Sequence, residues 1–109
     1  MKVKISCTWV RVPVLRGHSL AVWFKTRRPC SVSDVKRELA KAEGLDFRPE
    51  NADYPTPLDD AQRADVVFAG RLRRAKTAAN EFQLWIVSDN LYKGAALNSV
   101  QIAERIAAM

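Results

Sequence analysis

Hydrophobic and polar positions alternate along four stretches of the chain, and this two-residue period is typical of β-strands. The four predicted strands are residues 3–15, 20–25, 65–73 and 81–88. Gly17 permits a turn between the first two, which are therefore expected to form a hairpin. Pro13 cannot donate a hydrogen bond to a ladder, so the end of the first strand is expected at a sheet edge or a bulge.

The last two predicted strands are joined by a polar link that contains Asn80, and they predict an antiparallel hairpin. The alternation in the first of them places three apolar side chains on one face: Val66, Phe68 and Leu72. The second likewise has three on one face: Phe82, Leu84 and Ile86. Trp85 falls on the opposite face, which predicts that both faces of the sheet are covered somewhere.

Two segments have helical spacing. The first is expected over residues 32–42, with Ser31 as N-cap, Asp34 in the first turn and Gly44 as the stop. Its apolar stripe consists of Val32, Val35 and Leu39, and its solvated face carries Lys36, Arg37 and Lys41. The second helix is expected from Lys93 to about residue 107. Its apolar arc contains Leu97, Val100, Ala103, Ile106 and Ala107.

Between the first helix and the third strand, residues 44–63 are rich in proline and acidic side chains and predict an irregular loop. The resulting order is β-β-α-β-β-α, which indicates an α+β fold with a mostly antiparallel sheet covered by helices. A chain of 109 residues is at most one domain, so residues 1–109 are treated as a single unit.

Charge and cysteine content restrict the function classes. The net charge of +6 would suit nucleic acid, but lysine and arginine are scattered apart from the clusters 27–28 and 71–74, so no nucleic-acid partner is expected. No apolar run long enough for a membrane span occurs, and no membrane partner is expected. Cys7 and Cys30 fit neither a disulfide framework nor a metal site, which indicates a reducing cytoplasm and no bound metal.

Candidate chemistry centres on His18, the only histidine, at a predicted turn near Arg11 and Arg16. Imidazole titrates near neutrality, so this grouping suits proton transfer on an anionic substrate, whereas an ordinary surface histidine is the plain alternative. A cysteine–histidine pair is not expected, because Cys7 lies far back along the first predicted strand and nothing brings His18 to Cys30. Both cysteines are therefore interpreted as structural.

Four segments, in order, resemble the C-terminal part of aspartate-semialdehyde dehydrogenase. They are Val10 to Ser19 (VRVPVLRGHS), Tyr54 to Asp59 (YPTPLD), Val67 to Arg74 (VFAGRLRR) and Asp89 to Gln101 (DNLYKGAALNSVQ). The resemblance covers essentially the whole chain. It implies the C-terminal, dimerisation domain of a glyceraldehyde-phosphate-dehydrogenase-like enzyme, in which residues 93–109 form a terminal helix that packs on a separate nucleotide-binding domain.

The resemblance also implies roles for three residues. Arg11 would bind the carboxylate of the substrate, aspartate semialdehyde, which suits its bidentate guanidinium group. His18 would be the catalytic acid/base, and Asn90 would contact the cofactor NADP near the helix start at Gly94. The family's reaction interconverts aspartate semialdehyde plus phosphate with 4-aspartyl phosphate, in the biosynthesis of lysine, threonine and methionine.

This chain departs from the family pattern in two respects. The resemblance assigns the glycine-rich nucleotide-binding unit and the nucleophilic cysteine to a preceding half, and neither Cys7 nor Cys30 matches that nucleophile. Trp9 stands where relatives often have a smaller residue. The chain alone is therefore expected to be inactive, and to need an N-terminal half and a homodimer or higher oligomer. The alternative is a non-catalytic dimerisation module; a related reductase of acyl phosphates fits the Arg11–Val14 segment less well.

Overall fold

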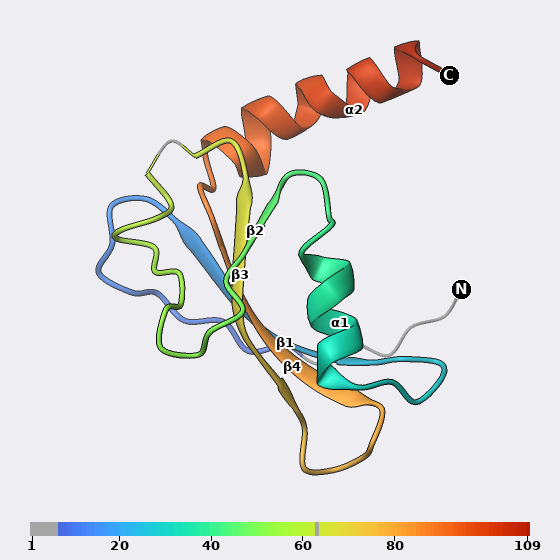
Figure 1. The fold of residues 1–109 in the computed structure, drawn as a ribbon. Helices are drawn as coiled ribbons and strands as arrows, with labels where there is room; N and C mark the ends of the chain where they lie inside the picture. The colour runs from blue at the N-terminus through green and yellow to red at the C-terminus, as the bar shows by residue number, and fades with distance from the viewer. Residues whose placement is uncertain (1–6, 63) are drawn as a thin grey trace.

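The computed structural model describes residues 7–62 and 64–109 and shows an α+β fold with one four-stranded sheet (Figure 1). The elements in chain order are β1 (His18–Lys25), α1 (Val32–Leu39), β2 (Leu45–Phe47), β3 (Val67–Arg74), β4 (Glu81–Ser88), the π-helix η1 (Tyr92–Leu97) and α2 (Asn98–Ala107). The strands are arranged β1-β4-β3-β2, with β4 antiparallel to both neighbours and β2 parallel to β3. The predicted fold class and mostly antiparallel sheet are confirmed.

The predicted first strand is wrong in the part that the structure describes. Residues 3–6 of that prediction lie outside the described residues, and residues 7–15 form no strand. The amide of Val14 donates to the carbonyl of Val12 at 2.9 Å, a tight turn around Pro13 that interrupts the extended alternation. The second predicted strand exists as β1, but it pairs with β4 and not with the preceding segment, so the expected hairpin is also wrong.

A short strand inside the predicted irregular loop was missed. The strand β2 has three residues, Leu45–Phe47, and pairs in parallel with β3. Three residues are too few to give a periodic signal in a sequence. The observed order is therefore β-α-β-β-β-α, and it differs from the predicted β-β-α-β-β-α in its first half.

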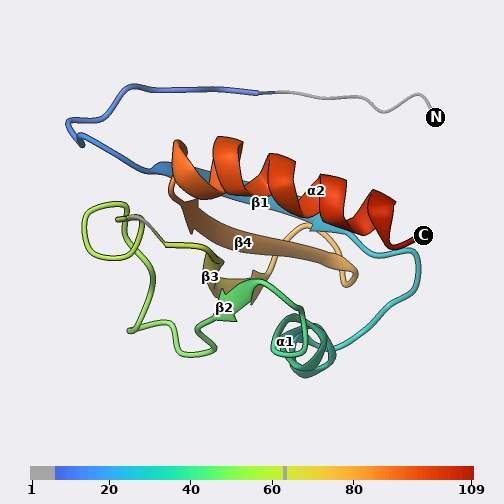
Figure 2. The same ribbon diagram turned by 90° about the horizontal axis from the view of Figure 1, so that it is seen from above.

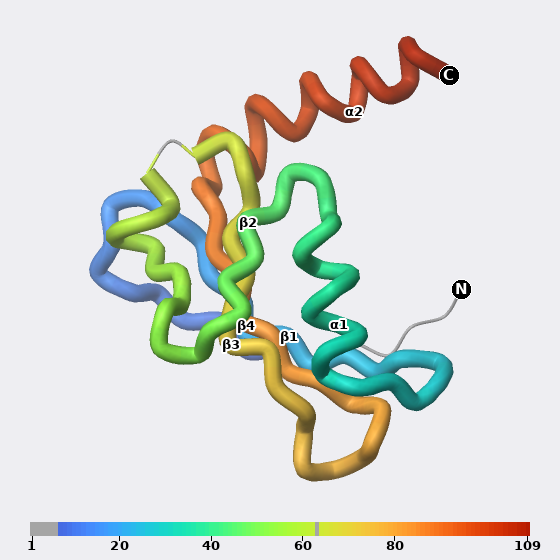
Figure 3. The backbone as a smooth tube through the Cα atoms, viewed as in Figure 1, coloured from blue at the N-terminus to red at the C-terminus, as the bar shows by residue number. Residues whose placement is uncertain are grey.

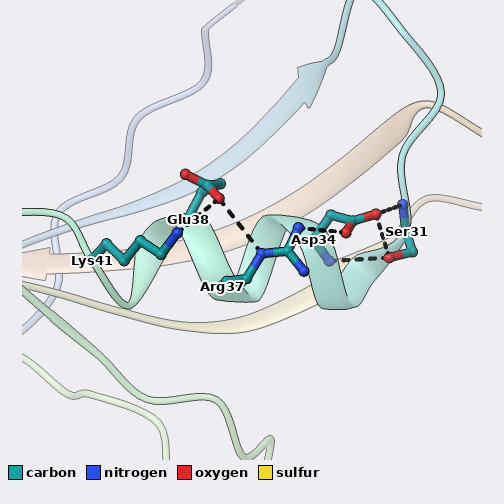
Figure 4. A network of polar contacts seen from close by, with 5 residues as sticks. All are labelled: Ser31, Asp34, Arg37, Glu38 and Lys41. Atoms are coloured by element: carbon teal, nitrogen blue, oxygen red, sulfur yellow. Dashed lines mark hydrogen bonds and ion pairs between the residues drawn. The ribbon is translucent and has the colours of Figure 1, made fainter.

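Helix α1 forms where the sequence predicts it, although it ends at Leu39. Ser31 and Asp34 form a reciprocal capping box: the Ser31 hydroxyl accepts from the Asp34 amide, and the Asp34 carboxylate accepts from the Ser31 amide, both at 3.0 Å (Figure 4). The predicted solvated face includes Arg37, which pairs with Asp34 at 2.7 Å. Lys36 is predicted on the same solvated face, but its Nζ is bound within the chain: it donates to the carbonyl of Pro49 at 2.7 Å.

These contacts favour the ionised form of Asp34. Hydrogen bonds from the Ser31 side chain and backbone, followed by the interaction with Arg37, lower the pKa of Asp34 from 3.8 to about 2. Because the pKa in the folded chain is the lower one, the carboxylate stabilises α1 above pH 3.8, and this contribution is lost as the pH falls toward about 2.

Replacing the cap gives a direct test of this local structure. We expect Ser31→Ala to lower the free energy of unfolding by about 1 kcal/mol, because the amide of Asp34 loses its acceptor at the helix start. Chemical denaturation followed by circular dichroism measures this change. Ser33→Ala, within the same helix, is the matched control and should change stability by less than about 0.5 kcal/mol. Equal effects of the two changes would contradict the capping interpretation.

A β-bulge in β3 changes which face its side chains occupy. Gly70 is opposite Trp85, whereas Arg73 is opposite Gln83, so β3 has one extra residue between these pairs. Arg71 lies there with a φ of 55°. The extra residue reverses the alternation, and the expectation that Phe68 and Leu72 share a face is wrong.

Two hydrophobic clusters cover the two faces of the sheet, as the position of Trp85 predicts. The first contains Ala69, Leu72, Phe82 and Leu84, packed against the α1 side chains Val32, Val35 and Leu39. The second contains Ala61, Phe68 and Val87, with Trp85 beside them. Figure 1 shows α1 against one face of the sheet and the segment between β2 and β3 on the other, and Figure 2 shows α1 near the β2 edge and α2 toward the β1 edge. The predicted shared face of Phe82, Leu84 and Ile86 is confirmed.

The chain exposes more surface than a compact monomer of its mass. Its accessible surface is 8600 Å², whereas surface scaling gives about 6,100 Å² for a compact monomer of this mass. Helix α2, which extends beyond the end of the sheet (Figure 1), contributes to the excess: it contains no buried residue, and its apolar side chains Val100, Ile102 and Ile106 are more than half exposed. Large exposed apolar areas are typical of surfaces that another protein or domain covers.

No helix among the described residues is long and apolar enough to cross a membrane.

Candidate functional site

The structure brings the turn before β1 next to the end of β4. His18 begins β1 and is opposite Ser88, the last residue of β4, so segments from opposite ends of the sequence meet at one corner of the sheet (Figure 1). The His18 side chain is exposed. The imidazole is thus accessible at a corner whose backbone is held by the sheet.

Gly17 fixes the backbone immediately before His18. Its φ of 114° favours glycine, and an added Cβ would lie 2.9 Å from the Cβ of Pro57 and 3.0 Å from that of Ala61. The amide of Gly17 donates to Oδ1 of Asn90 at 2.8 Å. Close packing on one side and a hydrogen bond on the other therefore define this turn.

Asp89 connects the same turn to the start of the C-terminal helices. It is fully buried, and its Oδ2 lies 3.6 Å from Nη1 of Arg16. Its Oδ1 accepts from the amides of Leu91 at 2.8 Å and Tyr92 at 2.9 Å, and its carbonyl accepts from the amide of Gly94 at 2.8 Å. A buried carboxylate with these partners satisfies amides at the helix start that have no partner within the helix.

The segment after β2 packs beneath the turn and is ordered by its prolines. Pro55 is fully buried, and its carbonyl accepts from Nε1 of Trp85 at 2.9 Å. A Cβ at Gly70 would lie 2.9 Å from Cδ of Pro55, so β3 needs a glycine at this crossing. Figure 3 shows this segment beside the turn that precedes β1, in agreement with the contact between Gly17 and Pro57.

Arg48 holds this segment to the sheet. It forms ion pairs with Asp60 and, at 3.3 Å, with Asp53, and its guanidinium lies 5.6 Å from the centre of the Phe68 ring. Burial alone would lower the pKa of Arg48, but the hydrogen bond and charge of Asp60, with the charges of Asp53 and Asp46, raise this pKa above its usual value. Arg48 therefore stays charged and links the acidic residues of this segment to Phe68 in β3.

Only part of the predicted site is brought together. His18 and Asn90 lie at the same corner, through Gly17. Arg11 lies in the irregular segment before the turn and is exposed, and the hydrogen bonds and ion pairs of the described residues include none between Arg11 and this corner. The structure thus leaves the substrate role of Arg11 as a prediction.

The cysteines do not form a pair with His18. His18 begins β1 and Cys30 follows its other end, and this strand is roughly 23 Å long at 3.3 Å per residue. Cys30 packs against the first core cluster, as expected for a structural cysteine, whereas Cys7 is exposed and not buried as expected. Groups of three or more histidine, cysteine or acidic residues that could hold a metal ion are absent from the described residues.

Sequence reasoning missed the roles of Asp89 and Arg16 at this corner. An Asp-Asn pair directly after a strand and before a helix is a local signal, because these side chains often accept from nearby backbone amides. The ion pair between Asp89 and Arg16 joins residues far apart in the sequence, so no local pattern predicts it. Chemically, the corner presents one exposed imidazole, which suits proton transfer, while the guanidinium of nearby Arg16 pairs with Asp89.

This fold and this corner define the class of protein. The family described as "Semialdehyde dehydrogenase, dimerisation domain" matches residues 1–93, and the chain belongs to this family. Among its relatives are aspartate-semialdehyde dehydrogenases. The enzyme of Shewanella violacea is 44% identical over 102 residues, and that of Bacillus subtilis is 44% identical over 107 residues. These alignments cover 94% and 95% of this chain.

A solved structure agrees with these relatives. The chain is similar to aspartate semialdehyde dehydrogenase II from Vibrio cholerae, with a TM-score of 0.82, 40% sequence identity and 89% of this chain covered. A second structure of that enzyme is a complex with ASA. The chain spans 30% of the Shewanella violacea relative and 29% of the Vibrio cholerae chain. It corresponds to the C-terminal part of these enzymes, and the suspected resemblance is confirmed.

Proposed function

We propose that this chain supplies the C-terminal, acid/base-bearing part of an NADP-dependent aspartate-semialdehyde dehydrogenase. The observation that carries the proposal is the corner formed by His18, Gly17 and Asn90, in a chain that is similar to such enzymes over 94% of its length. The complex of the Vibrio cholerae enzyme with ASA supports aspartate semialdehyde as the substrate. Phosphate would be the second substrate, and the cytoplasm the expected location.

In this proposal His18 exchanges a proton with the substrate's reacting oxygen. Its exposed imidazole can be reached from outside the chain, and the paired strands β1 and β4 fix its backbone. Arg11 would bind the substrate carboxylate with its planar guanidinium group, after the exposed segment that carries it comes to rest against the rest of the enzyme. The nucleophilic cysteine would come from the N-terminal half, since Cys30 lies at the far end of β1.

The residues at the corner are compatible with a bound nucleotide. Asn90 and Gly94 are exposed and lie at the start of η1, where a dinucleotide could approach the backbone closely. The Oδ1 atom of Asn90 accepts from Gly17, so the side-chain amide Nδ2 is the Asn90 atom that would hold the cofactor. Bound NADP would supply the hydride acceptor.

We further propose that the enzyme forms a homodimer through the sheet face that carries Trp23. This side chain is 64% exposed, and it lies beside a shallow hollow lined by Arg71, Arg73, Gln83 and Trp85. Exposed tryptophan with arginine is a combination enriched at protein interfaces. The excess accessible surface of the chain and the description of its family support an oligomer.

The test of the main proposal is reconstitution. We define the assembled enzyme as this chain combined with the separately expressed N-terminal part of the Shewanella violacea relative. We expect NADP reduction, with aspartate semialdehyde and phosphate, from the assembled enzyme and from neither part alone. Absence of activity in a mixture that forms a stable complex by size-exclusion chromatography would contradict the proposal.

A non-catalytic dimerisation module is the second candidate function. The observation that favours it is the match to a dimerisation domain in a chain that spans only 30% of its catalytic relative. A module of this kind would self-associate and would not bind NADP. Self-association together with an inactive complex in the reconstitution experiment would favour this candidate.

A further inference from the structure

The hydrogen bond between Asn90 and Gly17 lies where the backbone ladder of β1 and β4 stops. The last paired residues are His18 and Ser88. One step further, the carbonyl of Asp89 accepts from the amide of Gly94 at 2.8 Å, because the chain has already turned into η1. The side chain of Asn90 provides an acceptor for the Gly17 amide at this point, at 2.8 Å.

The same corner has further contacts that restrain the turn. Gly17 is closely packed against Pro57 and Ala61, and Arg16 pairs with the buried carboxylate of Asp89. The Asn90 bond joins residues that are 73 positions apart in sequence, and it acts on the amide adjacent to His18. A shift at Gly17 would therefore move the backbone of His18 directly.

We propose that Asn90 is a positioning residue, which holds His18 in its working geometry by accepting the Gly17 amide through Oδ1. The proposal rests on the acid/base role of His18 in the proposed function. It differs from the expected cofactor contact of Asn90, because that contact would use Nδ2 and this one uses Oδ1. The two roles belong to different atoms and can be separated by substitution.

Two substitutions of Asn90 in the assembled enzyme separate the roles. Asn90→Ala removes both atoms, whereas Asn90→Asp keeps an oxygen acceptor and removes the amide donor. We expect Asn90→Ala to lower kcat about tenfold, and Asn90→Asp to restore kcat to within about threefold of the unaltered enzyme. The separate cofactor contact through Nδ2 would, in addition, raise the KM for NADP in both variants, because both lack the amide donor. Equal kcat values for Asn90→Ala and the unaltered enzyme would overturn the proposal.

Asn80 provides a matched control. Its Nδ2 donates to the carbonyl of Thr26 at 2.8 Å, so it joins the same two strands at the opposite end of the sheet. Asn80→Ala removes a comparable link remote from His18, and we expect it to affect stability while kcat changes less than about twofold. A tenfold loss of kcat in Asn80→Ala would show that any weakening of this strand pair reduces turnover, and would overturn a specific role for Asn90.

Hydrogen exchange of the assembled enzyme tests the contact without activity. We expect the Gly17 amide to exchange at least tenfold faster in Asn90→Ala than in the unaltered enzyme or in Asn90→Asp, with the amide of buried Leu84 unchanged. Unchanged exchange at Gly17 would overturn the proposal. An inactive but complexed assembled enzyme would contradict the proposed function, and the exchange measurement would still decide whether Asn90 holds the turn.

Discussion

Replacement of His18 by alanine is expected to lower kcat of the assembled enzyme by about 10²–10⁴-fold, which is the usual contribution of a general acid/base. His18 is the only histidine in the chain, and it lies exposed at the corner where β1 meets the end of β4. Its removal leaves the backbone pairing with Ser88 intact, so the effect should fall on turnover and not on folding. Steady-state NADP reduction, with circular dichroism as the folding check, measures both quantities.

The neighbouring Ser19 provides the control for this prediction. Its Oγ is buried and has no hydrogen-bond partner among the described residues, so Ser19→Ala leaves no other polar group unpaired. We expect kcat of Ser19→Ala to stay within about twofold of the unaltered enzyme. A His18→Ala enzyme with unchanged turnover would remove His18 from the mechanism.

Replacement of Trp23 by alanine has the second large expected effect. Buried tryptophans at the centre of an interface contribute about 2–4 kcal/mol to association, so the dimer Kd should rise by about 30- to 1,000-fold. Trp23 projects from the middle of β1 and is 64% exposed in the single chain, so the change should have little effect on the fold of one subunit. Analytical ultracentrifugation over a dilution series measures the Kd.

The matched control for Trp23 is Ile106→Ala. Ile106 is 67% exposed, but it belongs to α2, which is expected to contact the nucleotide-binding domain and not the second subunit. Its replacement should leave the dimer Kd within about threefold. If Ile106→Ala weakened the dimer as much as Trp23→Ala, the proposed interface on the sheet would be wrong.

The sequence predicts an element correctly where its capping residue or hydrophobic pattern lies within the element itself and continues along its length. Helix α1 has a capping residue and an apolar stripe within eight residues, and β4 has an alternation that persists along its length, so both are found where expected. The segment 7–15 has the alternation but no partner strand in the described structure, and the turn at Pro13 interrupts it. An alternation with a period of two shows that a segment can form a strand. Whether it does depends on whether the fold places a partner strand next to it.

The bulge in β3 and the corner at His18 show a second limit. Arg71 has a positive φ without being glycine, so nothing in its residue type reveals the extra position that moves Leu72 to the other face. His18 and Asn90 could each be singled out, the first from its chemistry and the second from a resemblance. Their link through Gly17 depends on the antiparallel pairing of β1 with β4, a distant relationship that local patterns do not contain.

The central position of β4 has a consequence for how the chain folds during synthesis. Strand β1 is synthesised before its partner β4, and Asn90, which accepts a hydrogen bond from the turn before β1, lies 73 residues after Gly17. At about 5–20 residues per second, about 4–15 s pass between the synthesis of Gly17 and that of Asn90. During this interval Trp23 and the hydrogen-bonding edge of β1 are open to unwanted pairing, so the nascent chain should depend on chaperones more than a protein with neighbouring strand partners does.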